Sequence, residues 1–252
     1  NYVSWNWKAN GQGSSNTDGS INTTATSANT TSGFSISTFT ATGSAATVGH
    51  GLGVVPKLMI VKTVGVTGGW QLYHTSLGAT KYMEMDGTGA EATQPTRWNN
   101  TEPTSSVFSI GTEWANTNTL VAYCFADVQG YSKMGSYIGN GNATTPPFVY
   151  TGFKPAFVMT KVSSGSANSW TLSDITRDNS ITGGNGIGAR LLANTSAAED
   201  TNNIWASIQK YSNGFSPQGS DGVTNASGST YIYMAFAAAP LVGTNNVPAT
   251  AR

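Results

Sequence analysis

The chain has 252 residues, of which 10% are charged, and its 12 Lys and Arg balance its 12 Asp and Glu to a net charge of zero. Binding to nucleic acid or to an anionic membrane surface requires a concentration of positive charge, so this composition argues against both partners. The longest apolar stretches, such as Tyr231–Leu241, are shorter than the roughly 18 residues of a membrane span. We therefore expect no membrane insertion.

Aromatic residues make up 10% of the chain, which is typical of a folded protein rather than a disordered one. The single cysteine, Cys124, has no partner for an intrachain disulfide and lies in an apolar run. We interpret it as a small buried hydrophobe.

The first 32 residues differ in character from the rest. Tyr2–Ala9 alternates aromatic and polar residues like the end of a strand. Asn10–Ser32 contains mainly Asn, Ser, Thr and Gly, with Ile21 as its only large apolar residue. Such a composition predicts an extended linker or surface arm without a core of its own.

From Gly33 onward, short β-branched and aromatic runs alternate with clusters of Gly, Asn and Pro, which is typical of an antiparallel sandwich. The strands expected in the first half are Phe34–Thr40, Lys57–Thr63, Trp70–His74, Lys81–Met85, Ser106–Ile110 and Leu120–Ala126.

An internal repeat is the most informative feature of the chain. Pro56–Thr63 recurs as Pro155–Val162 after 99 residues, and Trp70 recurs as Trp170 after 100. A rising offset with preserved order is what loop insertions in a duplicated unit produce. The further matches are Trp98 with Trp205 and Ser106–Ser109 with Asn213–Ser216 at an offset of 107, and Leu120–Asp127 with Tyr231–Ala238 at 111.

We therefore predict an all-β chain of two tandem homologous antiparallel units, each like a β-sandwich or jelly roll. The predicted organisation is an N-terminal strand and arm over 1–32, repeat 1 over 33–130, repeat 2 over 131–241 and a C-terminal tail over 242–252.

The segment Tyr2–Ala9 also aligns with the closing strand of each repeat, although no unit precedes it. We expect this segment to be ordered, with Trp5 or Trp7 inserted against a repeat or a neighbouring subunit. Because unpaired strands recruit partners, we predict that Tyr2, Trp5 and Trp7 serve assembly by strand addition.

Several segments carry a resemblance to a known family: Tyr2–Ala9, His50–Gly53 with Pro56 and Lys57, Tyr131–Tyr137, Phe148–Ala156 and Tyr231–Ala237. They resemble a β-rich repeat of virion structural proteins from tailed phages, notably marine and cyanobacterial ones. In that family the repeat often lies beside a concanavalin-like lectin module and is described as tail-fibre-like. The resemblance covers nearly the whole chain and implies a location on the virion surface.

The resemblance and the uncharged loops together lead us to expect a non-enzymatic virion surface protein of the tail-fibre or capsid-decoration type. Such a protein would be a rigid adhesive scaffold whose partners are other virion proteins, copies of itself and host surface glycan. Two alternatives stay open: a polysaccharide-binding or depolymerising module, and a secreted self-assembling β protein joined by strand addition.

Some polar residues have the composition of catalytic or metal sites, yet simpler explanations exist. His50 and His74 lie in or beside turns, where we expect hydrogen bonds to the backbone. Glu84 and Asp86 would share one face of a strand, as a glycosidase pair or a calcium site requires, but a solvated strand face has the same pattern.

Two further clusters lie in repeat 2. Asp174, Arg177 and Asp178 are explained by a local ion pair, although a calcium loop is an alternative. The glycine-rich run 183–188 has no βαβ context and no Gly-Lys-Ser/Thr, so the pattern argues against a phosphate loop. We expect no catalytic residue, no metal and no cofactor.

The repeat also sorts the aromatic residues. Trp70 with Trp170, and Trp98 with Trp205, occupy matching positions, which predicts a shared packing role. Trp114 and Tyr82 have no aromatic counterpart in repeat 2. Trp114, and with it Tyr82, is therefore the best candidate for stacking on a sugar ring or anchoring a partner, and packing within the loop is the alternative for Trp114.

Overall fold

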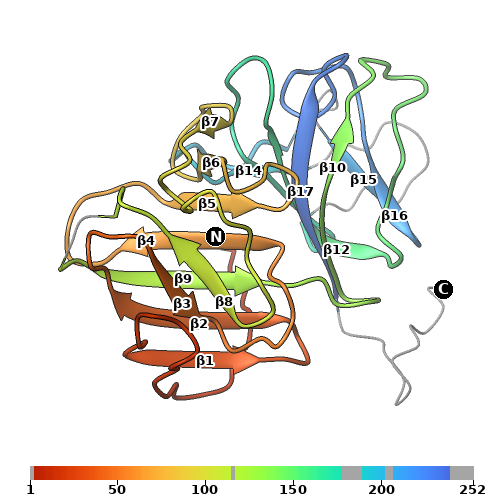
Figure 1. Cartoon of the computed structure of the whole chain (residues 1–252). Helices are drawn as coiled ribbons and strands as arrows, with labels where there is room; N and C mark the ends of the chain where they lie inside the picture. Colours follow the sequence, from red (N-terminus) through yellow and green to blue (C-terminus); the bar gives the residue numbers. More distant parts are fainter. Residues whose placement is uncertain (1–2, 115–116, 178–188, 202–206, 239–252) are drawn as a thin grey trace. The chain divides into compact units, whose positions relative to one another are not determined.

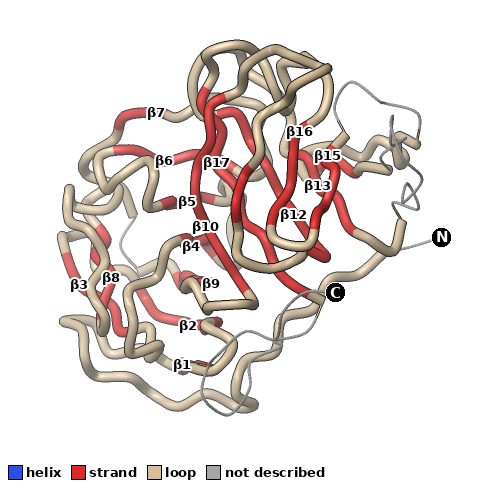
Figure 2. The backbone as a smooth tube through the Cα atoms, turned by 90° about the vertical axis from the view of Figure 1, so that its right-hand side faces the viewer, coloured by secondary structure: helices blue, strands red, loops and turns tan. Residues whose placement is uncertain are grey.

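The computed structural model describes residues 3–114, 117–177, 189–201 and 207–238. Over these residues the chain consists of strands and loops, without a helix (Figure 2). The strands form sheets of seven, five, three and two strands. The predicted all-β fold is therefore confirmed.

The chain divides into two compact units. Unit 1 comprises Asn1–Tyr73, Gly78–Tyr82 and Thr93–Val128, and unit 2 comprises His74–Leu77, Met83–Ala92 and Gln129–Arg252. Two short pieces of the predicted first repeat thus belong to unit 2.

The first half of the chain forms a seven-stranded sheet in the order β1-β2-β9-β4-β5-β6-β7, beside which β3 pairs with β8 (Figure 1). Each strand predicted from the sequence of this half is present, with its ends within one residue of the prediction. The bounds are β1 Ala25–Asn29, β2 Phe34–Thr40, β3 Ala46–Gly49, β4 Leu58–Thr63, β5 Gln71–His74, β6 Lys81–Glu84, β7 Ala92–Thr93, β8 Val107–Ile110 and β9 Thr119–Phe125.

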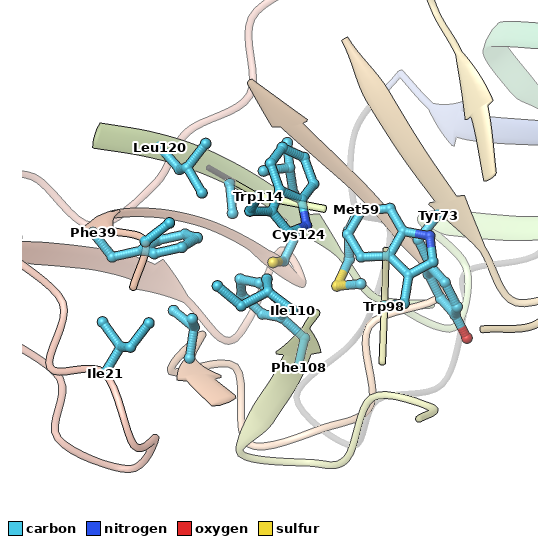
Figure 3. Close-up of a cluster of buried hydrophobic side chains, with 14 of the residues drawn as sticks. Ile21, Phe39, Met59, Tyr73, Trp98, Phe108, Ile110, Trp114, Leu120 and Cys124 are labelled. Carbon is cyan, nitrogen blue, oxygen red and sulfur yellow. The ribbon is translucent and has the colours of Figure 1, made fainter. Parts of the chain in front are cut away.

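Alternation along the central strands produces the core of unit 1. Met59 on β4 lies opposite Cys124 on β9, and both side chains are buried on the same face of the sheet. Phe39, Trp98 and further apolar residues complete this cluster (Figure 3). Burial raises the pKa of the Cys124 thiol to about 12, so the interpretation as a buried hydrophobe is confirmed.

The second half of the chain forms a five-stranded sheet in the order β10-β17-β12-β13-β14 and a three-stranded sheet in the order β11-β16-β15. Tyr231, Tyr233 and Phe215 belong to a buried cluster in this half. The bounds are β10 Ser132–Ile138, β11 Val149–Tyr150, β12 Pro155–Val162, β13 Thr171–Asp174, β14 Leu191–Leu192, β15 Ile208–Tyr211, β16 Gly214–Pro217 and β17 Thr230–Ala237.

The two halves share their strand order and their register. The order β2-β9-β4-β5-β6 of the first sheet recurs as β10-β17-β12-β13-β14, and β3 with β8 recurs as β11 with β16. The equivalent strand pairs also have equivalent partners under the sequence offsets, as a duplicated unit requires. The matched pairs are Leu58–Phe125 with Phe157–Phe236, and Val48–Phe108 with Val149–Phe215.

The arm Asn10–Ser32 is folded onto unit 1, so of the two predicted alternatives the extended linker is wrong. Its residues Ala25–Asn29 form the edge strand β1, paired with β2. Ile21 forms a bridge to Val48 and is 9% exposed within the core of unit 1. The composition was misleading because Ser and Thr hydroxyls accept hydrogen bonds from backbone amides here. The Ser20 amide donates to the Thr47 hydroxyl, and the Thr47 amide donates to the Ser20 hydroxyl, each at 2.9 Å.

The segment Val3–Ala9 has no strand, which corrects the comparison with the closing strands; Tyr2 lies outside the described residues. The ring of Trp7 nevertheless meets Phe125 edge-on, with centroids 5.7 Å apart, as we expected of a segment inserted against repeat 1. Trp5 is half-buried. The role of these residues in assembly stays a prediction.

Candidate functional site

Three aromatic side chains of unit 2 stand together on the surface of the small sheet β11-β16-β15. Phe148 is 51% exposed, Tyr150 is 60% exposed and Tyr211 is 38% exposed. Tyr150 lies opposite Gly214 in β16, and Gly214 lies opposite Tyr211 in β15, so the two tyrosines flank a glycine on one face. We call Phe148, Tyr150 and Tyr211 the aromatic platform.

The glycine allows the third ring to join the other two. A Cβ at Gly214 would lie 2.7 Å from Cζ of Phe148 and would collide with the carbonyl oxygen of Val149. The Phe148 ring therefore lies against Gly214, and its centroid is 5.8 Å from that of Tyr211 in an edge-to-face arrangement. Phe148 and Tyr211 thus form a ring pair, and Tyr150 adds a third exposed ring on the same face of the sheet.

Polar groups border the aromatic platform. Nζ of Lys133, on β10, lies 5.5 Å from the centroid of the Tyr150 ring. The hydroxyl of Tyr211 donates a 2.8 Å hydrogen bond to Oε1 of Gln209. Apolar rings with hydrogen-bonding groups at their edges match the apolar face and peripheral hydroxyls of a sugar.

The equivalent place in unit 1 is built differently. Phe148 and Tyr150 correspond to Thr47 and Gly49 under the register shared by β3 and β11. The arm covers that place: the amide of Ile21 donates to the Thr47 carbonyl at 3.0 Å, and a Cβ at Gly49 would collide with Asn16. The aromatic platform is thus not required by the shared fold, because unit 1 folds without it.

The sequence prediction for Trp114 has to be corrected. Trp114 is 5% exposed and packs on Trp98 at a centroid distance of 5.9 Å (Figure 3). Its Nε1 donates to the Arg97 carbonyl at 3.0 Å. A polar loop surrounds Trp114 in the sequence, but the ring turns into the core and offers no open face to a sugar.

Tyr82 lies at the margin of the same core. The guanidinium of Arg97 lies 4.2 Å from the centroid of its half-buried ring. One face of the ring is thereby covered by the cation rather than free for a ligand. The structure brings Trp114 and Tyr82 together through Arg97, which lies 5.6 Å from Trp114, as a packed group.

The two matched tryptophan pairs have different outcomes. Trp170 is 1% exposed, as a packing role predicts, but Trp70 is 39% exposed and stacks on Tyr123 with centroids 6.4 Å apart. A shared packing role is therefore wrong for Trp70. Trp98 is buried in the core, and Trp205 lies outside the described residues.

Both histidines bond the backbone, as predicted. In His50 one ring nitrogen accepts from the Leu52 amide at 3.2 Å and the other lies 3.2 Å from the Thr104 carbonyl. In His74 the partners are the Ser76 amide at 3.0 Å and the Tyr233 carbonyl at 3.2 Å. Burial lowers the pKa of His50 and lowers that of His74 to about 4, so both stay neutral at neutral pH.

The carboxylates Glu84 and Asp86 do not share a strand. β6 ends at Glu84, and Asp86 lies in the turn that follows, so the alternation that would align them stops between them. Asp174 does pair with Arg177, at 2.6 Å, as predicted; Asp178 and the glycine-rich run 183–188 lie outside the described residues. Over the described residues, no group of three or more His, Cys, Asp and Glu is placed to hold a metal.

Sequence reasoning missed the aromatic platform, although a signal existed. Tyr211 corresponds to Thr104 at the offset of 107, so none of the three rings has an aromatic counterpart in repeat 1. The lack of an aromatic counterpart, which singled out Trp114, therefore also holds for the aromatic platform. Trp114 differs from the platform rings in its burial, which depends on tertiary packing and cannot be read from the sequence.

The described residues contain no helix long and apolar enough to cross a membrane. Comparison with curated proteins and with solved structures gives no match. A family model described as a domain of unknown function, DUF7483, matches residues 1–240. Because this match spans nearly the whole chain, the protein belongs to the DUF7483 family.

Proposed function

We propose that the protein is a non-enzymatic adhesive module that binds glycans through the aromatic platform. The observation that carries the proposal is the exposure of Phe148, Tyr150 and Tyr211 on one face of a small sheet. Exposing three neighbouring rings opposes the hydrophobic effect, and the shared fold does not require them. Ligand binding would explain why these aromatic rings are exposed to solvent.

A virion-surface location of the tail-fibre or capsid-decoration type agrees with this proposal. It rests on the resemblance of segments such as Phe148–Ala156, which contains two of the platform rings, to phage structural proteins. Immunogold labelling of purified phage particles tests the location directly. Labelled particles are expected, and labelling confined to host debris would contradict it.

The test of binding is a glycan array followed by calorimetry with the best ligand. Tyr150→Ala should weaken binding at least about tenfold, because an aromatic anchor of an interface contributes about 2 kcal/mol or more. The matched control is Trp70→Ala, which removes an exposed ring from unit 1. Equal affinities for Tyr150→Ala and the native chain would contradict the proposal.

The same ligand tests for depolymerisation. A binding module should release no new reducing ends during incubation with the polysaccharide. Release that disappears in Glu84→Gln would instead favour a glycosidase and would contradict the non-enzymatic proposal.

A further inference from the structure

We infer that the aromatic platform selects anionic glycans of the uronic-acid type, with Lys133 as the specificity-determining residue. This inference rests on the proposed glycan binding and adds the ligand's charge to it. It follows from the position of Lys133 and from the charges around it.

Lys133 is fixed at the border of the platform by the sheet. It lies on β10 opposite Ala235 of β17, and its side chain is half-buried. Its ammonium lies 5.5 Å from the centroid of the Tyr150 ring. Because the ammonium lies over the Tyr150 ring, a sugar that contacts the exposed part of this ring would bring its substituents within reach of Lys133.

The charge of Lys133 is not neutralised locally. Within the described part of the chain, the structure gives Lys133 no ion pair with a carboxylate. Three carboxylates of unit 2 bind arginines instead: Asp174 and Glu199 bind Arg177 at 2.6 and 2.7 Å, and Asp200 binds Arg190 at 3.1 Å. The border of the platform therefore carries positive charge that a ligand carboxylate complements.

Two side chains near Tyr211 are neutral. Gln209 accepts the hydrogen bond from the Tyr211 hydroxyl, and the buried Ser216 lies opposite Gln209 on β16. Neither repels an anion. A neutral sugar would stack on the same rings but would leave the ammonium of Lys133 without a ligand partner. An acidic sugar can both stack on the rings and pair its carboxylate with the ammonium of Lys133, so it is the preferred ligand.

The experiment compares two forms of one ligand by titration calorimetry. Oligogalacturonate supplies the carboxylates, and its fully methyl-esterified form of equal length removes their charge while keeping the sugar rings. The native chain should bind the acid about tenfold more tightly than the ester, as expected of a charge-assisted hydrogen bond. Raising NaCl from about 50 to about 500 mM should reduce this preference by screening.

Variants at Lys133 test its role. Lys133→Gln should bind acid and ester equally, and Lys133→Arg should retain the preference because it keeps the charge. The side chain is half-buried and Arg preserves its length, so thermal unfolding of both variants checks that the fold is intact.

The outcomes separate this inference from the proposed function. Equal binding of acid and ester by the native chain, or a preference that survives Lys133→Gln, would overturn the inference. If Tyr150→Ala still abolished binding of both ligands, glycan binding would stand without it. Absence of binding to either ligand, or light scattering that shows the platform joining two copies of the chain, would overturn the inference as well.

Discussion

At the scale of single residues, matching turns in the two halves of the sequence are built with different side chains. Nδ1 of His74 accepts from the amide of Ser76 at 3.0 Å, and Oδ1 of Asp174 accepts from the amide of Thr176 at 3.0 Å. His74 and Asp174 occupy equivalent positions, two residues before the donor in each case. The position requires a side chain that accepts a hydrogen bond from the amide two residues later in the turn. A histidine at this position therefore has a structural role.

The buried His74 makes stability depend on pH. Its pKa is lowered from 6.5 to about 4 in the folded chain. As the pH falls below 6.5, His74 is therefore protonated in the unfolded state before it is protonated in the folded state. Stability from this residue is therefore complete above pH 6.5 and is lost as the pH falls toward 4, by up to about 3 kcal/mol. Urea unfolding at pH 7 and at pH 4.5 measures the loss.

The matched variant for this prediction is His74→Asn, which keeps an acceptor for the Ser76 amide but cannot titrate. The loss between pH 7 and pH 4.5 should be smaller in the variant than in the native chain. Identical losses in both proteins would show that other groups, such as carboxylates, account for the acid sensitivity.

The placement of Trp114 gives a second prediction. Because its ring packs on Trp98 in the core, Trp114→Ala should destabilise the chain by about 3 kcal/mol. Thermal unfolding measures this, with Trp70→Ala as the exposed control, for which a smaller effect is expected. A variant of Trp114 with native stability would show that the ring does not belong to the core.

At the scale of elements, the sequence predicts the central strands well and the arm poorly. Strands such as Phe34–Thr40 alternate apolar and polar residues between turn signals, and this local pattern determines them. Ala25–Asn29 lacks large apolar residues, so its strand depends on pairing with β2 rather than on its own pattern. Local periodicity could not reveal an element that tertiary hydrogen bonds create.

The arm should contribute measurably to stability. Ile21 is buried beside Val48, so Ile21→Ala should cost about 2 kcal/mol in urea unfolding. Val66→Ala, at an exposed site of unit 1, is the control and should change stability by less than about 0.5 kcal/mol. If both variants matched the native chain, the arm would be the linker that its composition suggests.

The three-stranded sheet depends on Gly214. A Cβ there would collide with the Val149 carbonyl and with Phe148, so Gly214→Ala should lower the melting temperature and weaken glycan binding together. Gly89→Ala is the control, because a Cβ at Gly89 would meet no atom within 4 Å. Native binding by Gly214→Ala would show that the position of the Phe148 ring does not matter.

At the scale of the whole molecule, the strand order shared by the two halves separates what the fold requires from what one half adds. Shared strand order and register account for the cores of both units, and the repeat makes this much readable from the sequence. The site was not predicted correctly because unmatched aromatics fall into two classes. Trp114 is enclosed by Trp98 and Arg97. Phe148 and Tyr150 are exposed because the arm that covers the equivalent positions in unit 1 has no counterpart among the described residues of unit 2.

The central claim is that the aromatic platform contacts the ligand. The most direct measurement is aromatic NMR of chain labelled in Phe, Tyr and Trp rings, titrated with the glycan that binds best. We predict that the ring signals of Phe148, Tyr150 and Tyr211 shift with ligand concentration, while those of the buried Trp98 and Trp114 stay constant. Shifts confined to Trp70 and Tyr123, or an absence of shifts in the platform rings at saturating ligand, would contradict the account.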